Sequence, residues 1–175
     1  NAEELLDLTS RIGEVAGTLN FTGGEPLLRH ELPELLAYTH ARGIDNIVTT
    51  NGLLLDDNWL EKAEGNLYML KIGMMGATEE TNDYIRGRGH FEVALKALDL
   101  MRKYEMISCM KISLDKHNYS EMEQMVQLAV EKGVKQLVFG QLVGMGRAAK
   151  QLRELVFSYD ELKAVQEKVG ELRDT

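Results

Sequence analysis

Apolar side chains recur at every third or fourth position in four segments of the chain. This spacing places them on one face of a helix and therefore predicts four amphipathic helices. The four stripes are Leu5, Leu8, Ile12 and Val15; Leu32, Leu35 and Leu36; Phe91, Ala94, Leu95, Leu98 and Met101; and Met122, Met125, Val126, Ala129 and Val130. Two Ser-x-x-Glu sequences, at residues 120–123 and 158–161, predict capping boxes at two helix starts.

Five short apolar runs lie between these stripes, each of strand length and without proline. The runs are Thr18–Thr22, Asn46–Thr50, Leu67–Met74, Met106–Leu114 and Lys135–Leu142. Strands that alternate with helices are typical of parallel βα units. The expected fold class is therefore α/β, with about five parallel strands.

The composition narrows the classes of partner. A chain of 175 residues fits one domain, which we assign to residues 1–175. The net charge of −8 argues against nucleic acid as a ligand, and no apolar run is long enough to cross a bilayer, so we expect no membrane partner. Cys109 is the single cysteine, which rules out an internal disulfide and favours a cytoplasmic location. The four histidines lack metal-ligand spacing, so we predict no metal ligands in this chain.

Polar and glycine-rich clusters follow each of the five predicted strands. These clusters are Gly23-Gly24-Glu25, Asn51-Gly52, residues 73–76, Ser113 with Asp115 and Asn118, and Gly144 with Gly146 and Arg147. The carboxyl ends of parallel strands form the functional edge of open α/β sheets and of βα barrels. The pattern therefore favours a binding site at this edge, although turn residues gather at strand ends for purely structural reasons as well.

The sequence Gly23-Gly24-Glu25-Pro26 has the most specific local chemistry. Adjacent glycines let the backbone turn sharply and approach a ligand closely, and Pro26 keeps Glu25 extended. Main-chain carbonyls beside one carboxylate suit a cationic group such as an ammonium, and they make a poor phosphate site. A plain strand-to-helix turn explains the same residues equally well.

Four motifs taken together resemble the radical SAM superfamily, most closely its peptide- and cofactor-maturation branches. They are residues 22–28 (Thr-Gly-Gly-Glu-Pro-Leu-Leu), 50–52 (Thr-Asn-Gly), 84–87 (Tyr-Ile-Arg-Gly) with 91–95 (Phe-Glu-Val-Ala-Leu), and 143–148 (Val-Gly-Met-Gly-Arg-Ala). Each motif alone is a modest indication, and their common order and spacing make the resemblance specific. It extends from Leu19 to about Leu172.

The resemblance implies a partial (β/α)6 TIM-like barrel that holds S-adenosylmethionine (SAM) and a four-iron, four-sulfur cluster. The backbone around the Gly-Gly-Glu motif would bind the methionyl ammonium, and Arg86 would pair with the methionyl carboxylate. Ser113 or Asn118 would reach the ribose or the carboxylate, and the main chain near residues 141–142 would face the adenine. The implied cofactor-binding residues are Gly23, Gly24, Glu25, Pro26, Asn51, Gly52, Arg86, Ser113, Asn118, Gln141, Leu142 and Gly146. At positions 86, 113 and 118, a solvated arginine and capping or turn residues are the structural alternatives.

The chain departs from the family pattern in two places. It lacks the Cys-x-x-x-Cys-x-x-Cys sequence that holds the family's cluster, and Cys109, in the middle of a predicted strand, is expected to be a small buried residue. We therefore expect a truncated core domain without the first barrel strand and the cluster loop, with Asn1 and Ala2 as cloning residues, and with no bound cofactor or catalysis in this chain alone. Residues 73–76 (Gly-Met-Met-Gly) stand where many maturases have Ser-Leu-Asp-Gly.

Three functions stay open at this point. A longer parent enzyme would cleave SAM reductively to modify a peptide or a small-molecule cofactor precursor. Residues 144–149 (Gly-Met-Gly-Arg-Ala-Ala) also fit a dinucleotide-binding fingerprint. The third function is a non-catalytic βα scaffold. For the chain alone, the open edge of the strand at Leu19–Phe21 predicts self-association.

Overall fold

The computed structural model of the chain describes residues 16–142 and 153–173, together with residues 4, 7, 9 and 11. These residues contain one five-stranded sheet whose strands are all parallel and follow one another in chain order. The strands are β1 (Thr18–Phe21), β2 (Asp45–Thr50), β3 (Met69–Met74), β4 (Ser108–Leu114) and β5 (Gln136–Gln141). Each strand lies within its predicted run or extends it by one residue, so the expected α/β fold with about five parallel strands is confirmed.

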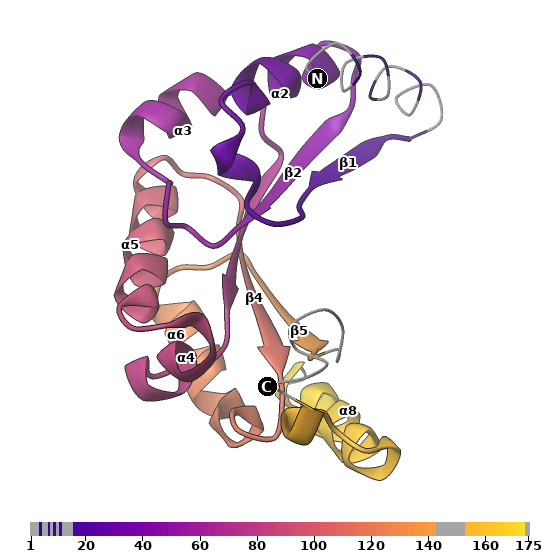
Figure 1. The fold of residues 1–175 in the computed structure, drawn as a ribbon, viewed down its shortest axis with the longest axis vertical. Coiled ribbons are helices and arrows are strands. Elements are labelled where there is room, and N and C mark those ends of the chain that lie inside the picture. Colours follow the sequence, from indigo (N-terminus) through magenta and orange to yellow (C-terminus); the bar gives the residue numbers. More distant parts are fainter. Residues whose placement is uncertain are drawn as a thin grey trace.

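Helices connect the successive strands on one side of the curved sheet, and a last helix follows the fifth strand (Figure 1). They are α2 (Leu32–His40), α3 (Asp57–Ala63), α4 (Glu79–Arg86), α5 (His90–Lys103), α6 (Met122–Glu131) and α8 (Tyr159–Arg173), with short 3-10 turns η1 (Pro26–Leu28), η2 (Tyr119–Glu121) and η3 (Arg153–Leu155). Parallel strands in chain order, with their crossover helices on one side, give the curvature of a βα barrel. None of the helices in the described part of the chain is long and apolar enough to span a membrane.

Three of the four predicted helical stripes coincide with helices α2, α5 and α6. Val130 is a wrong member of its stripe, because it is 74% exposed at the end of α6. The stripe within residues 5–15 lies outside the described residues. No stripe predicted α3, since a helix of seven residues is too short to display one.

One of the two predicted capping boxes is confirmed. The backbone N–H of Ser158 donates to the Glu161 carboxylate at 2.7 Å, and that of Glu161 donates to the Ser158 hydroxyl at 3.4 Å. The box at residues 120–123 is wrong, because Ser120 lies inside η2 and α6 begins at Met122 without a side-chain cap. The neighbouring Glu121 accepts from the backbone N–H of Ala77 at 2.8 Å, so this turn is organised by contacts with the segment before α4.

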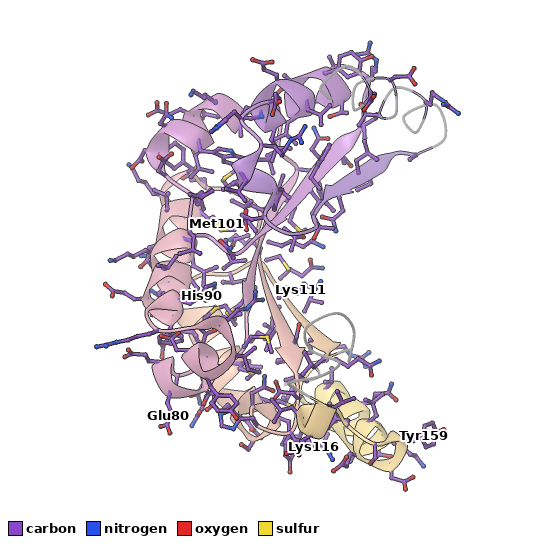
Figure 2. All side chains as sticks on the ribbon, in the orientation of Figure 1. Glu80, His90, Met101, Lys111, Lys116 and Tyr159 are labelled. Carbon is purple, nitrogen blue, oxygen red and sulfur yellow. The ribbon has the colours of Figure 1, made fainter. Side chains whose placement is uncertain are left out.

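The two faces of the sheet differ because alternate residues of a strand point to opposite sides. The core face packs against the helices and carries the buried residues Val48, Leu70, Ile72, Met110 and Ile112. The opposite face, called the open face below, carries the alternate positions, among them Asn20, Thr49, Lys71, Cys109 and Lys111. Figure 2 shows Lys111 on the side of the sheet away from Met101, which belongs to the core.

Candidate functional site

The loop after β1 has the geometry that its glycines and proline predict. Gly23 has φ of +136°, a conformation that residues with a side chain rarely adopt. Glu25 is extended, with φ of −137° and ψ of 110°, as the following proline requires. Gly23 and Gly24 are exposed, whereas Pro26 is buried at the start of η1. The loop therefore presents its main chain to solvent and anchors itself through Pro26.

The carboxylate of Glu25 joins this loop to the end of β2. Its Oε1 accepts from the Thr50 hydroxyl at 2.6 Å and from the backbone N–H of Leu27 at 3.1 Å. Its Oε2 accepts from the backbone N–H of Asn51 at 2.9 Å. Three donors thus fix the position of Glu25, which in turn holds the two loops together. Thr50 belongs to the motif at residues 50–52, yet its bond to Glu25 was not predicted, because a threonine at the end of a strand is ordinary.

Asn51 and Gly52 form a tight turn at the same edge. The Asn51 side chain accepts from the backbone N–H of Leu53 at 2.8 Å. Gly52 is buried, with φ of +82°, and a Cβ at this position would lie 3.0 Å from the Cβ of Ala97 in α5. The glycine therefore permits both the turn and the close approach of α5.

Arg86, at the end of α4, reaches back over the end of β3. A Cβ placed on Gly73 would lie 2.9 Å from Nη2 of Arg86. Gly73 alternates with Ile72 and belongs to the open face, so the guanidinium lies on that face. Gly73, which stands where many maturases have a serine, thus leaves space for the guanidinium of Arg86.

Two opposing effects act on the charge of Arg86. The residue retains exposed area, yet desolvation by nearby protein atoms lowers the pKa of its guanidinium. The negative charge of Glu25 opposes this shift. Because arginine keeps its proton under ordinary conditions, the charge is available to an anionic ligand.

Two side chains within α4 bond to the segments that precede and follow the helix, and neither was predicted from the sequence. Asn82 accepts from the backbone N–H of Met75 at 2.9 Å. Asp83 accepts from the backbone N–H groups of Gly89 and Phe91, the latter at 2.8 Å. These bonds fix the turn that follows Arg86. The sequence offers no indication of them beyond the glycines at positions 87 and 89.

His90 is buried beneath this turn. Its Nδ1 lies 3.2 Å from the Asn82 amide nitrogen, and its side chain is 6% exposed. Burial lowers the pKa of His90, and the positive charge of Arg86 lowers it further, while Asp83 opposes both. His90 is therefore a neutral packing group at the base of the site.

Asn118 joins the ends of β3 and β4. Its amide nitrogen donates to the carbonyls of Met75 at 2.7 Å and Ser113 at 2.9 Å, and its Oδ1 accepts from the backbone N–H of Asp115 at 2.9 Å. Asn118 is fully buried, whereas Ser113 is half-buried on the open face. Within the described part of the chain the Ser113 hydroxyl has no hydrogen-bond partner. Ser113 is thus the group of this pair that is free to meet a ligand.

The end of β5 differs from the other strand ends. The backbone N–H of Leu142 donates to the carbonyl of Leu114 at 2.8 Å. A mostly apolar pocket of about 420 Å³ lies beside Gln141, lined in part by Phe139 and Phe157. Phe139 pairs with Ile112 and belongs to the core face, so this pocket is on the helix side of the sheet. Gly146, with the whole fingerprint at residues 144–149, lies outside the described residues.

The described site residues meet at one edge of the sheet. The loops at Gly23 and Asn51 are joined through Glu25, and Arg86 lies over the end of the next strand. All five strands are parallel, so their carboxyl ends share this edge. The arrangement combines an exposed loop main chain, a guanidinium and a free hydroxyl on the open face. Such a set suits a ligand that carries both an ammonium and a carboxylate.

Comparison with known proteins gives matches over most of the chain. A sequence model of the radical SAM superfamily matches residues 1–129. The chain is 32% identical over 136 residues to Fe-coproporphyrin III synthase of Methanosarcina barkeri, with 77% of this chain and 34% of that protein covered. It is 29% identical over 160 residues to mycofactocin maturase MftC of Mycobacterium ulcerans, with 86% and 43% covered. The chain therefore spans less than half the length of either relative.

The fold also matches solved structures. One is anSMEcpe with bound AdoMet and the Cp18Cys peptide, with a TM-score of 0.80 and 21% identity. The match covers 98% of this chain and 52% of that chain. At this level of identity the likeness concerns the fold, and it agrees with the partial barrel described above.

Proposed function

The chain belongs to the radical SAM superfamily, and we propose that the protein it comes from cleaves SAM reductively to modify a peptide or a cofactor precursor. SAM, when bound and supplied with one electron, would provide a carbon radical for hydrogen abstraction from a substrate, with methionine as the second product. The residues of this chain would bind SAM, orient it and exclude water. We assign no catalytic residue within residues 1–175.

One observation supports this function more than any other: the Glu25 bonds place the glycine loop at the same edge as Arg86. The carbonyls near Gly23 and Gly24 would accept from the methionyl ammonium, and the Arg86 fork would bind the methionyl carboxylate. In this proposal, Pro26, Asn51 and Gly52 shape the loops, and Glu25 holds them. These roles fit a zwitterionic ligand, because the bonds of Glu25 would keep the ammonium-binding loop at a fixed position relative to the end of β2.

The remaining contacts are proposed for the ribose and the adenine. The Ser113 hydroxyl would reach the ribose, and Asn118 would hold Ser113 through its main-chain carbonyl. The main chain at Gln141 and Leu142, with Gly146, would face the adenine. A test of this part is the SAM affinity of Ser113→Ala, which we expect to fall by less than that of an Arg86 variant.

The iron–sulfur cluster does not fit residues of this chain. Cys109 is the one cysteine of the sequence and is fully buried, whereas a four-iron cluster requires several thiolates. We therefore propose that the cluster ligands belong to sequence outside residues 1–175, and that residues 1–175 are one truncated core domain without catalysis on its own. The free buried thiol also agrees with a reducing cytoplasm as the location.

The substrate class is proposed from the relatives. One relative is named for an iron coproporphyrin and another for the maturation of mycofactocin, so a cofactor precursor or a peptide is the class we propose. The alternative function, dinucleotide binding through residues 144–149, fits the described sheet less well. A doubly wound dinucleotide fold reverses its strand order at a switch point, whereas the five described strands run in chain order.

Self-association is a separate proposal for the chain alone. β1 is the first strand in the order of the described sheet, and it pairs with β2 on its inner side. An unpaired strand edge favours pairing with a second copy. Light scattering coupled to gel filtration should show a dimer or larger species, and a monomer at all concentrations would contradict the proposal.

The main test uses the natural full-length protein that carries this chain. It would be reconstituted without oxygen with iron and sulfide, reduced with dithionite and supplied with SAM. We expect release of 5′-deoxyadenosine that depends on SAM and on the reconstituted cluster. A reconstituted protein that neither binds SAM nor releases 5′-deoxyadenosine would show the proposed function to be wrong.

A further inference from the structure

Two lysines are neighbours on the open face. Lys71 of β3 lies opposite Cys109 of β4, and Lys111 of β4 lies opposite Gly73 of β3. With a strand spacing of about 4.8 Å and a rise of about 3.3 Å per residue, the two lysine Cα atoms are roughly 8 Å apart. Lys71 is half-buried and Lys111 is exposed, so both ammonium groups are accessible from the same side of the sheet.

Neither ammonium group has a carboxylate partner within the described ranges 16–142 and 153–173. Five of the described lysines, Lys96, Lys103, Lys116, Lys132 and Lys168, each form a salt bridge with an aspartate or a glutamate. Among the other described lysines, Lys62, Lys135 and Lys163 form none either. What distinguishes Lys71 and Lys111 is that two lysines without a carboxylate partner lie on adjacent strands of the same face, in a chain with a net charge of −8. The open-face lysines are thus not satisfied by the protein itself.

The residues around the two lysines do not neutralise their positive charge, and one neighbouring residue adds to it. Thr49 is the neighbour of Lys71 on β2, and Val138 is the neighbour of Lys111 on β5, so neither flank contributes a negative charge. Among the described strand positions of the open face, one carboxylate occurs, that of Asp45, at the far amino end of β2. Arg86, which lies over Gly73, supplies a third cation at the carboxyl edge.

The positive charges of both lysines are felt at the position of Cys109, which neighbours both of them on the open face. Burial raises the pKa of its thiol, and the positive charges of Lys71 and Lys111 each oppose this rise. Both ammonium groups are therefore close enough to the Cys109 position to stabilise a negative charge there. A ligand group bound above Cys109 would experience the same two charges.

We propose that Lys71 and Lys111 bind carboxylate groups of the substrate, so that the substrate is an anionic molecule with at least two carboxylates. This inference rests on the proposed function, because it assigns the substrate of the same site. SAM has a single carboxylate, for which Arg86 is the proposed partner, so the two lysines need a different anion. Two carboxylates are matched by the propionates of a tetrapyrrole or by the acidic side chains of a peptide.

The experiment uses the reconstituted full-length protein with SAM present. Four probes would be titrated: coproporphyrin III and its neutral tetraamide, and hexaglutamate and hexaglutamine. We expect one acidic probe to bind more tightly than its neutral counterpart, which identifies the source of the carboxylates. Lys71→Met and Lys111→Met should each weaken that binding by roughly tenfold and leave the neutral probe unaffected. Lys62→Met, an exposed lysine on α3, is the matched control and should have no effect.

Several results would overturn the inference. One is equal binding of acidic and neutral probes by the wild-type protein, and another is an equal loss in the Lys62→Met control. A third is a loss of SAM affinity in the open-face variants that accounts for the change, since the lysines would then serve SAM. Release of 5′-deoxyadenosine by the wild-type protein in the same preparation separates the two proposals. If release occurs without any dependence of probe binding on the lysines, the inference alone is wrong.

Discussion

The core face and the open face of the sheet are made from alternate residues of the same strands, yet they meet different requirements. In β3, Leu70 and Ile72 are fully buried against the helices, while Lys71 and Gly73 face the other side beside charged groups. The strand residues that build the core face are apolar and buried, whereas the open face keeps ammonium groups that have no carboxylate partner among the described residues. Substitution of a core-face residue should therefore lower the stability of the protein, whereas substitution of its neighbour on the open face should weaken ligand binding.

The largest difference is expected between neighbouring residues of β3. Ile72→Ala removes buried methyl groups from the centre of the core and should lower the free energy of unfolding by about 2–5 kcal/mol. Lys71→Ala, one position earlier, should lower it by less than about 1 kcal/mol, because its charge has no partner in the described structure. Chemical denaturation of the two variants measures both values. Similar losses in the two variants would contradict the separation of the faces.

Two glycines near the end of β3, Gly73 and Gly76, allow a second comparison between a substitution that affects stability and one that affects ligand binding. A Cβ on Gly76 would lie 2.8 Å from the backbone nitrogen of Asn82, so Gly76→Ala should displace α4 and cost about 1–3 kcal/mol. A Cβ on Gly73 meets the mobile end of Arg86, so Gly73→Ala should cost little stability and weaken SAM binding. Thermal unfolding and SAM titration of both variants distinguish the two effects. Unchanged SAM affinity in Gly73→Ala would argue against the placement of Arg86 in the site.

Asp115 gives a smaller effect with a definite dependence on pH. It is fully buried, Oδ1 accepts from the backbone N–H groups of His117 and Asn118, and Oδ2 has no hydrogen-bond partner among the described residues. Burial raises the pKa of this carboxyl group, and the two backbone bonds oppose the rise. The folded protein therefore holds the proton more tightly than the unfolded chain. The contribution of Asp115 to stability is present at low pH and is lost as the pH rises through the folded value.

Asp115→Asn tests this sign. The asparagine keeps the acceptor at Oδ1 and removes the charge, so the free energy of unfolding near neutral pH should rise by about 1 kcal/mol. The variant should also lose part of the decline in stability as the pH rises above about 4, the ordinary value of an aspartate. Urea titrations across this range measure the effect. A variant that is less stable than the wild type at every pH would contradict the prediction.

The smallest expected effect is at the start of α8, far from both faces. The backbone N–H of Ser158 and the ammonium of Lys116 lower the pKa of Glu161 to about 2. A lowered pKa means that the stabilising contribution is present above the ordinary glutamate value and is lost as the pH falls toward about 2. Glu161→Gln should therefore reduce the acid sensitivity of unfolding slightly, and Glu167→Gln on the same helix should not. Equal acid sensitivity in wild type and Glu161→Gln would disprove the role of this capping box.

The fold was predictable because the spacing of apolar residues identified the strands and several helices, and their alternation along the chain identified the type of sheet. Each of the five strand-length runs contains a strand, and the alternation with helices predicted their parallel pairing. The failures have local causes. Ser120 resembles a cap, but the bonds of Asn118 and Glu121 organise a 3-10 turn there. Val130 was grouped with the core stripe, but it directly follows the buried Ala129 and points to solvent.

The strand ends that make up the candidate site were predictable from the sequence, and the contacts between them were less so. Predicted strand ends indicated Glu25 and Asn51, because chemistry gathers at the carboxyl edge of parallel strands. Arg86 was indicated by the resemblance to the radical SAM superfamily. The partners that hold them, Thr50 and Asp83, depend on distances between loops, which sequence spacing does not encode. The lysines of the open face were missed for a similar reason. Only the register of β3 against β4 brings them together.

The affinity of the reconstituted full-length protein for SAM is the most direct test of the central claim, that the carboxyl edge of this sheet binds SAM through the Glu25 loop and Arg86. Arg86→Met should weaken SAM binding by at least about tenfold, because it removes a charged partner of a carboxylate. Arg88→Met, an exposed arginine two residues further on, should leave the dissociation constant unchanged. Equal affinity in the two variants, measured by calorimetry, would contradict the account.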